Sequence, residues 1–482
     1  MKPYNVIAIG GGTAGLVTTA AVAGLGGRAA LIERNKMGGD CLNFGCVPSK
    51  SLISSARLAQ SIRDADKWGL EPAEPVTDFQ KVFASMREQR AVIEPNDSAE
   101  RFRSLGVDVY EAEARFVSPH EVKLSTGERL KARHIVITAG SRAGVPPIPG
   151  IDDIPYYTNE TIFDQLDEKP DKLIIIGGGP IGTELGQTFN RLGVEVHQIE
   201  LTSQILSRED PDVAEVMMEK LHREGVHIHT VTKPERFYLQ DGRIHLDMTG
   251  PEGSRTLDAG AVLVAAGRVP NLDKLNLEAA GIAHTKKGIT VNRKLQTSVP
   301  HIWAAGDIAG GLQFTHLADF HARHIVGNIL KPFPFLYSEF DDSLIPWSTY
   351  TEPEVGRVGL NEKEAKDRDI AYEVWQVPFS EVDRAITERA TDGFVKILTE
   401  QGSDKILGAT VVGLHGGDLL HEIVLAMKHG IGLKGIASTI HAYPTLAEVM
   451  RKVGDKYNRS RLTPRVAGLL RWLFQRQLKG LK

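Results

Sequence analysis

Two long segments of the chain share nearly the same order of hydrophobic and polar positions. Residues 6–33 and 173–200 each open on a short apolar run and turn through a cluster of glycines. Each continues with small and apolar residues at helical spacing, and closes on a second apolar run that ends in a carboxylate. The apolar runs are typical of buried strands and the stretch between them of a helix. Each segment is therefore predicted to form a βαβ unit.

The glycines and the terminal acid occupy matching positions in the two segments: Gly10, Gly12, Gly15 and Glu33 in the first, and Gly177, Gly179, Gly182 and Glu200 in the second. Glycines at this spacing make a tight turn and admit a pyrophosphate to the helix N-terminus, while the acid accepts hydrogen bonds from ribose hydroxyls. One such motif can serve chain geometry alone. Two copies with the same flanking strands predict two dinucleotide-binding sites.

The acid of the second segment also bears on the choice of nucleotide. Glu200 would repel a 2′-phosphate, and no arginine follows it directly, since Arg208 is the next one along the chain. The second site is therefore predicted to bind NADH in preference to NADPH.

Length and composition are those of a globular protein with several domains. At 482 residues the chain is too long for one core, and about three domains are expected. It is 41% hydrophobic and 24% charged, with a net charge of -4. The chain therefore lacks the excess of positive charge that is typical of proteins that bind nucleic acid.

Two features bear on the compartment. The apolar stretch 4–26 resembles a signal peptide or membrane span preceded by Lys2, but its glycines would weaken a spanning helix. The chain has only two cysteines, too few for a disulfide-stapled scaffold or a cysteine-only metal site. A reducing cytoplasm is expected, in which a Cys41–Cys46 disulfide would be catalytic or redox-sensing.

Cys41 and Cys46 lie just past the first βαβ unit, in the segment GGDCLNFGCVPSK. Five residues of regular helix rise about 7.5 Å, beyond the limit of about 7 Å for a bridgeable pair. A disulfide therefore requires irregular backbone, which Gly45 allows. Nearby Lys50 would favour a thiolate. The alternative is a pair of buried cysteines that never react.

Several motifs resemble those of one known family. The strongest is CLNFGCVPSK. The others are ITAGS at 137–141, AAGRVPN at 265–271, AAGDIAGG at 304–311, YTEPEVGRVGL at 350–360 and HAYPTLAE at 441–448. Together they span nearly the whole chain and resemble the pyridine nucleotide-disulfide oxidoreductases, in the branch containing dihydrolipoamide dehydrogenase, glutathione reductase and mercuric reductase.

The resemblance implies an α/β fold with two Rossmann-like dinucleotide-binding domains and a C-terminal α+β dimerisation domain. The FAD-binding domain is expected at residues 1–150 and 275–335, with the NAD(P)-binding domain, residues 151–274, inserted between them. The dimerisation domain is expected at 340–458, so two active sites would be built across a homodimer.

The resemblance also assigns residues to the cofactors. Those expected to hold FAD are Gly10, Gly12, Gly15, Glu33, Lys50, Ala139, Gly140 and Asp307. Those expected to hold the nicotinamide cofactor are Gly177, Gly179, Gly182, Glu184, Glu200 and Gly267. Lys50 would pair with Glu184 beside the flavin ring.

The same family pattern implies an electron path. Hydride would pass from NADH through FAD to the Cys41–Cys46 disulfide, with the flavin supplying the two-electron chemistry. Cys46 would be the charge-transfer thiol next to the flavin, and Cys41 the thiol that meets the substrate.

The C-terminal motif departs from the thiol-disulfide members of the family. They carry a histidine directly before the proline of this motif, where this chain has Tyr443, although the partner glutamate is present as Glu448. Tyrosine, with a pKa near 10, is a poor general base at neutral pH. Tyr443 resembles the mercuric reductase branch, whose C-terminal cysteine pair is absent here. Tyr443 and Glu448 are expected to act at the partner's cysteines, and His441 to be an interface residue without chemistry.

The predicted function is reduction of a disulfide, a metal ion such as Hg(II), or another electrophilic acceptor. One alternative is a dihydrolipoamide dehydrogenase. Another is a flavin-linked quinone reductase or oxidase whose cysteines sense redox state. A third is a non-catalytic protein that binds cofactors or docks on membranes.

The segment 459–482 contains basic residues and no acidic ones. On a helix beginning near Pro464, one face would carry Leu462, Val466, Leu469, Leu470, Leu473 and Phe474, and the other Arg465, Arg471, Arg476, Lys479 and Lys482. This pattern is typical of a helix at an anionic membrane surface. The alternatives are a helix packed on its own dimer and a frayed tail.

Overall fold

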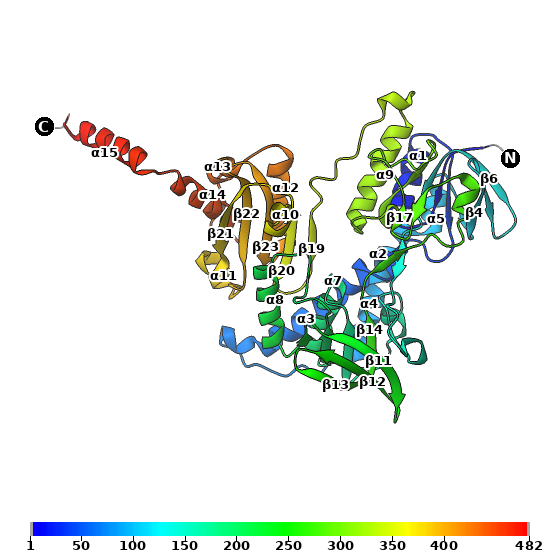
Figure 1. Cartoon of the computed structure of the whole chain (residues 1–482), viewed down its shortest axis with the longest axis horizontal. Coiled ribbons are helices and arrows are strands. Elements are labelled where there is room, and N and C mark those ends of the chain that lie inside the picture. The colour runs from blue at the N-terminus through cyan, green and yellow to red at the C-terminus, as the bar shows by residue number, and fades with distance from the viewer. Residues whose placement is uncertain (1–2, 480–482) are drawn as a thin grey trace. The chain divides into compact units, whose positions relative to one another are not determined.

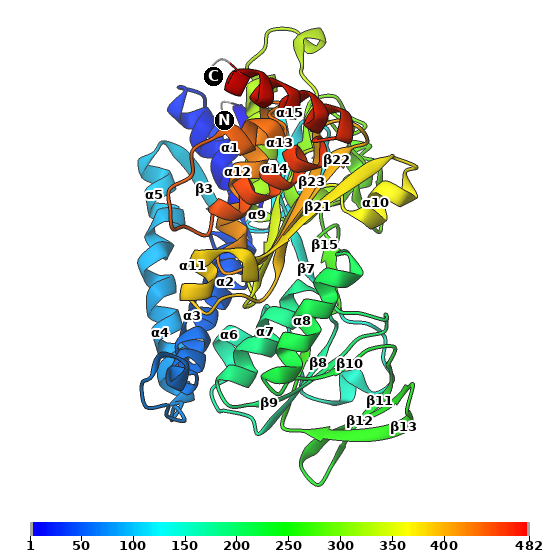
Figure 2. The same ribbon diagram turned by 90° about the vertical axis from the view of Figure 1, so that its left-hand side faces the viewer.

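The computed structural model describes residues 3–479, and the chain forms two compact units. The first joins the chain up to Ser207 with Leu221–Asp341. The second joins Arg208–Lys220 with the chain from Asp342 onward. Figures 1 and 2 show the elements of both units.

The first predicted βαβ unit is confirmed. Strand β1 (Tyr4–Ile9), helix α1 (Thr13–Gly24) and strand β2 (Ala29–Glu33) follow one another, and the two strands pair in parallel. They belong to a seven-stranded sheet with the order β3-β2-β1-β6-β5-β4, in which β18 also pairs with β6. The other strands of this sheet are β3 (Val107–Glu111), β4 (Ala114–Ser118), β5 (Glu121–Leu124), β6 (Arg129–Ile137) and β18 (Ile302–Ala304).

The second βαβ unit is confirmed in the same way. Strand β8 (Lys172–Ile176), helix α7 (Pro180–Arg191) and parallel strand β9 (Glu195–Ile199) lie in a sheet of order β10-β9-β8-β14. The edge strands are β10 (His227–His229) and β14 (Ala261–Val264). A three-stranded meander packs on this sheet through an apolar cluster, and Figure 2 shows its strands, β11 (Lys233–Gln240), β12 (Arg243–Gly250) and β13 (Gly253–Ala259).

Helices cover these sheets and bring distant segments together. Helix α3 (Cys46–Arg63) packs against both α4 (Phe79–Ile93) and α7, and α1 packs against α9 (Thr315–Ile329). The remaining short elements of this unit are α2 (Gly39–Asn43), α5 (Ala99–Ser104), α6 (Ile162–Gln165), β7 (Ser141–Ala143), β15 (Arg268–Pro270), β16 (His284–Thr285) and β17 (Gly288–Ile289).

The stretch 4–26 contains β1 and α1, whose apolar residues lie in the core of the first unit. Among residues 3–479, no helix has both the length and the apolar composition needed to cross a bilayer.

The second unit is built on a five-stranded antiparallel sheet of order β19-β20-β23-β22-β21. Helix α12 packs on β20 and β23, and α14 packs on β21, β22 and α13. The strands are β19 (Trp347–Thr349), β20 (Glu354–Gly359), β21 (Tyr372–Pro378), β22 (Phe394–Glu400) and β23 (Ile406–Gly413). The helices are α8 (Pro211–Arg223, whose last turn belongs to the first unit), α10 (Glu362–Asp367), α11 (Asp383–Thr387), α12 (Gly416–Lys428), α13 (Leu433–Ser438), α14 (Glu448–Ser460) and α15 (Pro464–Lys479).

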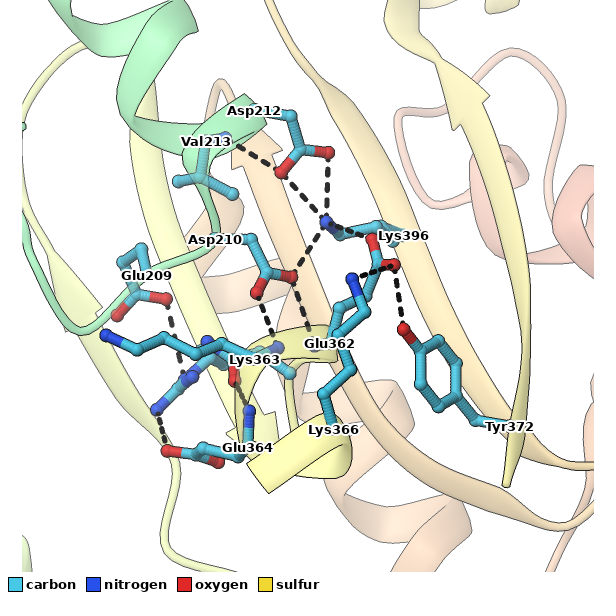
Figure 3. Close-up of polar contacts among 12 residues, drawn as sticks. Glu209, Asp210, Asp212, Val213, Glu362, Lys363, Glu364, Lys366, Tyr372 and Lys396 are labelled. Carbon is cyan, nitrogen blue, oxygen red and sulfur yellow. Dashed lines mark hydrogen bonds and ion pairs between the residues drawn. The ribbon is translucent and has the colours of Figure 1, made fainter. Parts of the chain in front are cut away.

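A buried cluster of charges attaches Arg208–Lys220 to this sheet (Figure 3). The Nζ of Lys396, a side chain that is 1% exposed, lies 2.8 Å from both Asp210 Oδ2 and Asp212 Oδ1 and 3.1 Å from Glu362 Oε1. Beside it, buried Arg357 bonds Glu364 at 2.8 Å. A buried lysine is tolerated only where carboxylates compensate its lost hydration. The cluster therefore holds Arg208–Lys220 in one position on the five-stranded sheet.

Candidate active site

The first glycine turn leaves no room for side chains where β1 meets α1. A Cβ at Gly10, whose φ is +120°, would lie 2.3 Å from the carbonyl oxygen of Thr138, and one at Gly15 would lie 1.9 Å from that of Gly10. Gly12, the N-cap of α1, is different, because the nearest atom to its Cβ would be 3.8 Å away. Packing explains Gly10 and Gly15, whereas Gly12 leaves open space at a helix N-terminus, where a phosphate fits.

The second turn repeats this geometry. A Cβ at Gly177 would lie 2.5 Å from the carbonyl oxygen of Ala265, and one at Gly182 would lie 2.2 Å from that of Gly177. Gly179 is the N-cap of α7, and its Cβ would meet no atom within 4 Å. Each turn therefore combines two glycines required by the fold with one that keeps a cradle open.

The two terminal acids are fixed in the same way. The Gly11 N–H donates to Glu33 Oε2 at 2.5 Å, and the Gly178 N–H donates to Glu200 Oε2 at 2.6 Å. The second oxygen of Glu200 accepts from the backbone N–H and the hydroxyl of Thr202 at 2.8 and 2.9 Å. Both carboxylates are thus held beside their glycine turns.

Each turn opens into a hollow. A pocket of about 750 Å³ is lined by the second glycine turn, Glu200 and Gly267. A smaller pocket of about 60 Å³ lies along Gly10, Glu33 and Ala139. The larger volume is within the usual range for cofactor sites, and the open N-termini at Gly12 and Gly179 fit the pyrophosphates of FAD and of a nicotinamide dinucleotide.

The loop at Ala139 and Gly140 is held by the chain around residue 271. Asn271 donates its Nδ2 to the Ala139 carbonyl at 2.9 Å and its backbone N–H to the Gly140 carbonyl at 3.0 Å. Gly140 has a φ of +64°, a conformation that favours glycine. This arrangement explains why ITAGS and AAGRVPN occur in the same chain.

Asp307 lies in a buried polar cluster. Burial raises the pKa of its carboxyl group, although Ser141 Oγ donates to Oδ2 at 2.5 Å and Arg268 Nε lies 3.6 Å from the same oxygen. The other end of Arg268 contacts Asp40 Oδ1 at 3.0 Å. Arg268 therefore joins the AAGD segment to α2, the short helix that carries Cys41.

The cysteines lie on either side of a break between two helices. Cys41 is in α2, Cys46 begins α3, and Phe44 and Gly45 between them leave the helical conformation. The irregular backbone that the spacing requires is present. Both cysteines are free thiols, Cys41 half-buried and Cys46 exposed. The hydroxyl Oγ1 of Thr315, the first residue of α9, lies 3.5 Å from Cys46 Sγ.

The two thiols differ in acidity. The hydrogen bond with Cys41, assisted by Thr315 and by the charge of Lys50, lowers the pKa of Cys46 to about 6. The same hydrogen bond, together with burial, raises the pKa of Cys41. At neutral pH the reduced pair therefore carries its negative charge on Cys46 and its proton on Cys41.

Lys50 and Glu184 meet where α3 packs on α7. Lys50 Nζ lies 2.9 Å from Glu184 Oε2, and the carboxylate is 7% exposed. Because Lys50 is one helical turn after Cys46, this ion pair places a fixed positive charge near the thiolate.

The C-terminal motif lies in the second unit. Tyr443 is exposed and donates its hydroxyl to Asp383 Oδ2 at 2.9 Å, which raises the pKa of the phenol. Glu448 is buried and accepts from Arg451 at 2.8 Å, while its Oε2 has no hydrogen-bond partner within residues 3–479. Tyr443 and Glu448 do not bond each other among these residues. His441 contacts Glu422 Oε1 at 2.9 Å through Nε2.

Sequence reasoning did not single out three residues of this site: Asp40, Arg268 and Thr315. Arg268 lies in the quoted motif AAGRVPN, so its charge was a usable signal. Thr315 lies 269 residues after Cys46 in an ordinary helical stretch, and no local pattern marks it.

Comparison with known proteins gives two family matches. Residues 4–322 match the pyridine nucleotide-disulphide oxidoreductase family, and residues 345–453 match the dimerisation domain of that family. The second match implies a homodimer.

Individual relatives agree. The chain is 32% identical to a dihydrolipoyl dehydrogenase of Haloferax volcanii, covering 94% of this chain and 95% of that protein. It is 30% identical to a mercuric reductase of Staphylococcus aureus, covering 93% and 81%. Among solved structures, the Cu(II) complex of the HOCl-induced flavoprotein disulfide reductase RclA from Escherichia coli aligns with a TM-score of 0.84 and 27% identity. That alignment covers 94% of this chain and 99% of the other.

The α/β fold with dinucleotide-binding domains and a C-terminal dimerisation domain is confirmed by these matches, as is the assignment as an enzyme that uses FAD and a pyridine nucleotide. The chain belongs to the pyridine nucleotide-disulphide oxidoreductase family.

Proposed function

We propose that this enzyme is an NADH-dependent reductase in which Cys41 and Cys46 pass electrons to an electrophilic acceptor: a disulfide, a soft metal ion such as Hg(II), or a related compound. One observation carries the proposal: the exposed Cys46 thiol lies 3.5 Å from the Thr315 hydroxyl and one helical turn from the Lys50–Glu184 ion pair, and its pKa is lowered to about 6. An inert buried pair would have neither an exposed sulfur nor a fixed positive charge beside it.

Bound FAD would supply two-electron transfer between the nicotinamide and the cysteine pair. Gly12 leaves open the helix N-terminus for its pyrophosphate, while Glu33, the Ala139–Gly140 loop and Asp307 would hold the rest of the cofactor. Lys50, fixed by Glu184 at 2.9 Å, stabilises negative charge near Cys46. When an acceptor arrives, Cys41 would pass its proton to the Cys46 thiolate, and the Cys41 thiolate so formed would bond the acceptor.

The dimerisation domain would complete each site with Tyr443 and Glu448 from the other chain. Glu448 Oε2 is buried without a hydrogen-bond partner in the described chain, and such a group is usually satisfied in the assembled protein. The exposed phenol of Tyr443 can donate a hydrogen bond or contact a metal ion, but its raised pKa keeps it protonated at neutral pH, so it is not available there as a general base.

NADH is the favoured nucleotide. Glu200 lines the large pocket with both oxygens fixed by hydrogen bonds. Lys233, the basic residue that lines the same pocket, lies 2.7 Å from Glu235 Oε2. A 2′-phosphate would therefore meet a carboxylate beside its ribose and a lysine that is already neutralised.

One observation favours a metal ion over lipoamide or glutathione disulfide: Tyr443 stands where thiol-disulfide members of the family have histidine. The relatives are divided, since they include a dihydrolipoyl dehydrogenase as well as a mercuric reductase and a structure described as a Cu(II) complex. Thiolates are soft ligands, which suit a soft ion such as Hg(II).

The test is an anaerobic titration of the flavoprotein with NADH while the visible spectrum is recorded, followed by turnover with lipoamide, glutathione disulfide, Hg(II) and Cu(II). A long-wavelength thiolate-to-flavin band and reduction of a metal ion are expected. Cys41→Ser and Cys46→Ser should abolish acceptor reduction while NADH still bleaches the flavin, which shows that each variant is folded.

Three results would contradict the proposal. Unchanged turnover in both serine variants would make the cysteines sensors in a quinone reductase or oxidase. Fast lipoamide turnover would indicate a dihydrolipoamide dehydrogenase. Failure of NADH to bleach the flavin of the wild-type protein would indicate a non-catalytic cofactor-binding protein.

A further inference from the structure

Helix α15 (Pro464–Lys479) presents a continuous apolar surface that nothing in the described chain covers. None of its residues is buried. Val466, Leu469, Leu470 and Leu473 recur at helical spacing and are all 39% or more exposed, and Phe474 is 63% exposed. A stripe of large exposed apolar side chains on one helix marks an interaction surface.

The rest of the helix surface is basic. Arg465, Arg471, Arg476 and Lys479 lie outside the apolar stripe, and there is no acidic residue from Arg459 to Lys479. Trp472 lies among the basic residues, with the Arg476 guanidinium 5.5 Å from its ring centroid. Lys482, also predicted on the basic face, lies outside the described residues.

We propose that α15 binds an anionic lipid surface, lying in the plane of the interface with its leucines in the acyl region and its basic side chains on lipid phosphates. This proposal does not depend on the electron acceptor. Leucine, phenylalanine and tryptophan combined with arginine and lysine are the composition of interfacial helices. The charge of the helix complements anionic lipid even though the whole chain has a net charge of -4.

Two other interpretations of α15, a membrane-spanning helix and a contact with the partner subunit, fit less well. The helix has 16 residues and four basic side chains, so it is too short and too charged to cross a bilayer. The match to the family's dimerisation domain ends at residue 453, so α15 lies beyond the region that this domain accounts for. To pack against α15, a partner subunit would also need an acidic surface opposite the basic side chains of this helix.

The test is flotation of the full-length flavoprotein with vesicles of phosphatidylcholine alone or with about one-third phosphatidylglycerol. The wild-type protein should partition at least about tenfold better into the anionic vesicles and be released by high salt. A variant with Arg465, Arg471, Arg476 and Lys479 changed to Gln should lose this difference. The vesicle-induced blue shift of tryptophan emission should shrink in Trp472→Phe.

The matched control removes four exposed basic side chains elsewhere by changing Arg129, Lys131, Lys274 and Arg293 to Gln. It should float like the wild type, and both charge variants should keep NADH-dependent turnover in the absence of lipid. Equal flotation of the wild type and the tail variant, or of the two charge variants, would overturn the proposal. A changed oligomeric state in the tail variant, without vesicle binding by the wild type, would assign α15 to the dimer instead.

Discussion

The thiolate of Cys46 is stabilised by neighbours from two separate parts of the chain: Cys41 and Lys50 of its own motif, and Thr315, which lies 269 residues further on. Only the Thr315 hydroxyl can be removed without touching a cysteine or the Lys50–Glu184 ion pair. Removing this hydroxyl therefore tests one contribution to the pKa of Cys46 without changing the others.

Thr315→Val should raise the pKa of Cys46 from its value of about 6. One lost hydrogen bond to a thiolate corresponds to about one pKa unit. The measurement is the pH dependence of alkylation of the reduced enzyme by iodoacetamide, whose rate increases as the thiolate forms. Thr315→Ser, which keeps the hydroxyl, should retain the wild-type midpoint. Equal midpoints in the Val and Ser variants would remove Thr315 from the site.

The preference for NADH can be tested at Glu200. Glu200→Ala should raise the KM for NADH roughly tenfold, because hydrogen bonds to a charged group contribute about 1.5 kcal/mol, and should lower the KM for NADPH. Steady-state kinetics with both nucleotides measure the change. Glu195→Gln alters the acid at the other end of β9, outside the pocket, and should leave both KM values unchanged. The prediction fails if the two variants behave alike.

At the scale of elements, β9 and β10 carry a directional chain of hydrogen bonds. Arg255 only donates, so His229 accepts at Nδ1 and carries its proton on Nε2, 3.0 Å from His197 Nδ1. His197 then donates from Nε2 to Glu195 at 2.8 Å. This series of hydrogen bonds requires both histidines to be neutral. Burial lowers the pKa of each, that of His229 to about 4.

This series of hydrogen bonds predicts that the free energy of unfolding depends on pH. His229 binds its proton with an ordinary pKa of 6.5 when unfolded and about 4 when folded. Between these values the unfolded state holds more protons, so the free energy of unfolding should fall as the pH falls from 6.5 to 4. Urea unfolding across this range measures the slope. His229→Gln should reduce the slope, leaving the part that comes from other histidines whose pKa burial lowers: His134, to about 4, and His197, His301 and His324. An unchanged slope would contradict the assignment to His229.

The local elements were predictable and the long-range contacts were not. Both βαβ units follow from periodicity within about 30 residues, and the helix break at Gly45 follows from the spacing of two cysteines. Lys50 and Glu184 are 134 residues apart, and only the family resemblance paired them. Thr315 and Arg268 reach the site because α1 packs on α9 and β15 pairs with β7. No pattern within a single segment encodes such packing.

At the scale of the whole molecule, the segment Arg208–Lys220 belongs to the second unit, although the residues before and after it in sequence belong to the first. Apolar periodicity gives no sign of this, because the decisive contacts are those of Lys396 with Asp210 and Asp212 on another stretch of chain. The cluster in Figure 3 is therefore expected to contribute to the stability of the second unit.

Lys396→Met should destabilise the protein by about 3 kcal/mol, since it leaves the buried carboxylate of Asp210 without compensation and removes the partner of Asp212 and Glu362. The free energy of urea unfolding, followed by far-ultraviolet circular dichroism, measures the loss. Lys405→Met is the matched control, because this lysine is 67% exposed and 4.0 Å from Glu400, and it should change stability by less than about 0.5 kcal/mol. Equal effects of the two substitutions would show that the buried cluster is not stabilising.

If Glu448 completes the site of the partner subunit, two inactive chains should restore one another. In a dimer of one Cys41→Ser chain and one Glu448→Gln chain, one site would contain both defects and the other neither. Random assortment of equal amounts makes about half of the dimers mixed, so about one quarter of wild-type turnover should appear after subunit exchange. The measurement is NADH-dependent acceptor reduction before and after exchange, with each variant alone as control. Turnover no higher than the average of the two variants would place Glu448 and Cys41 of the same chain in one site, because only a site shared between subunits regains activity by mixing.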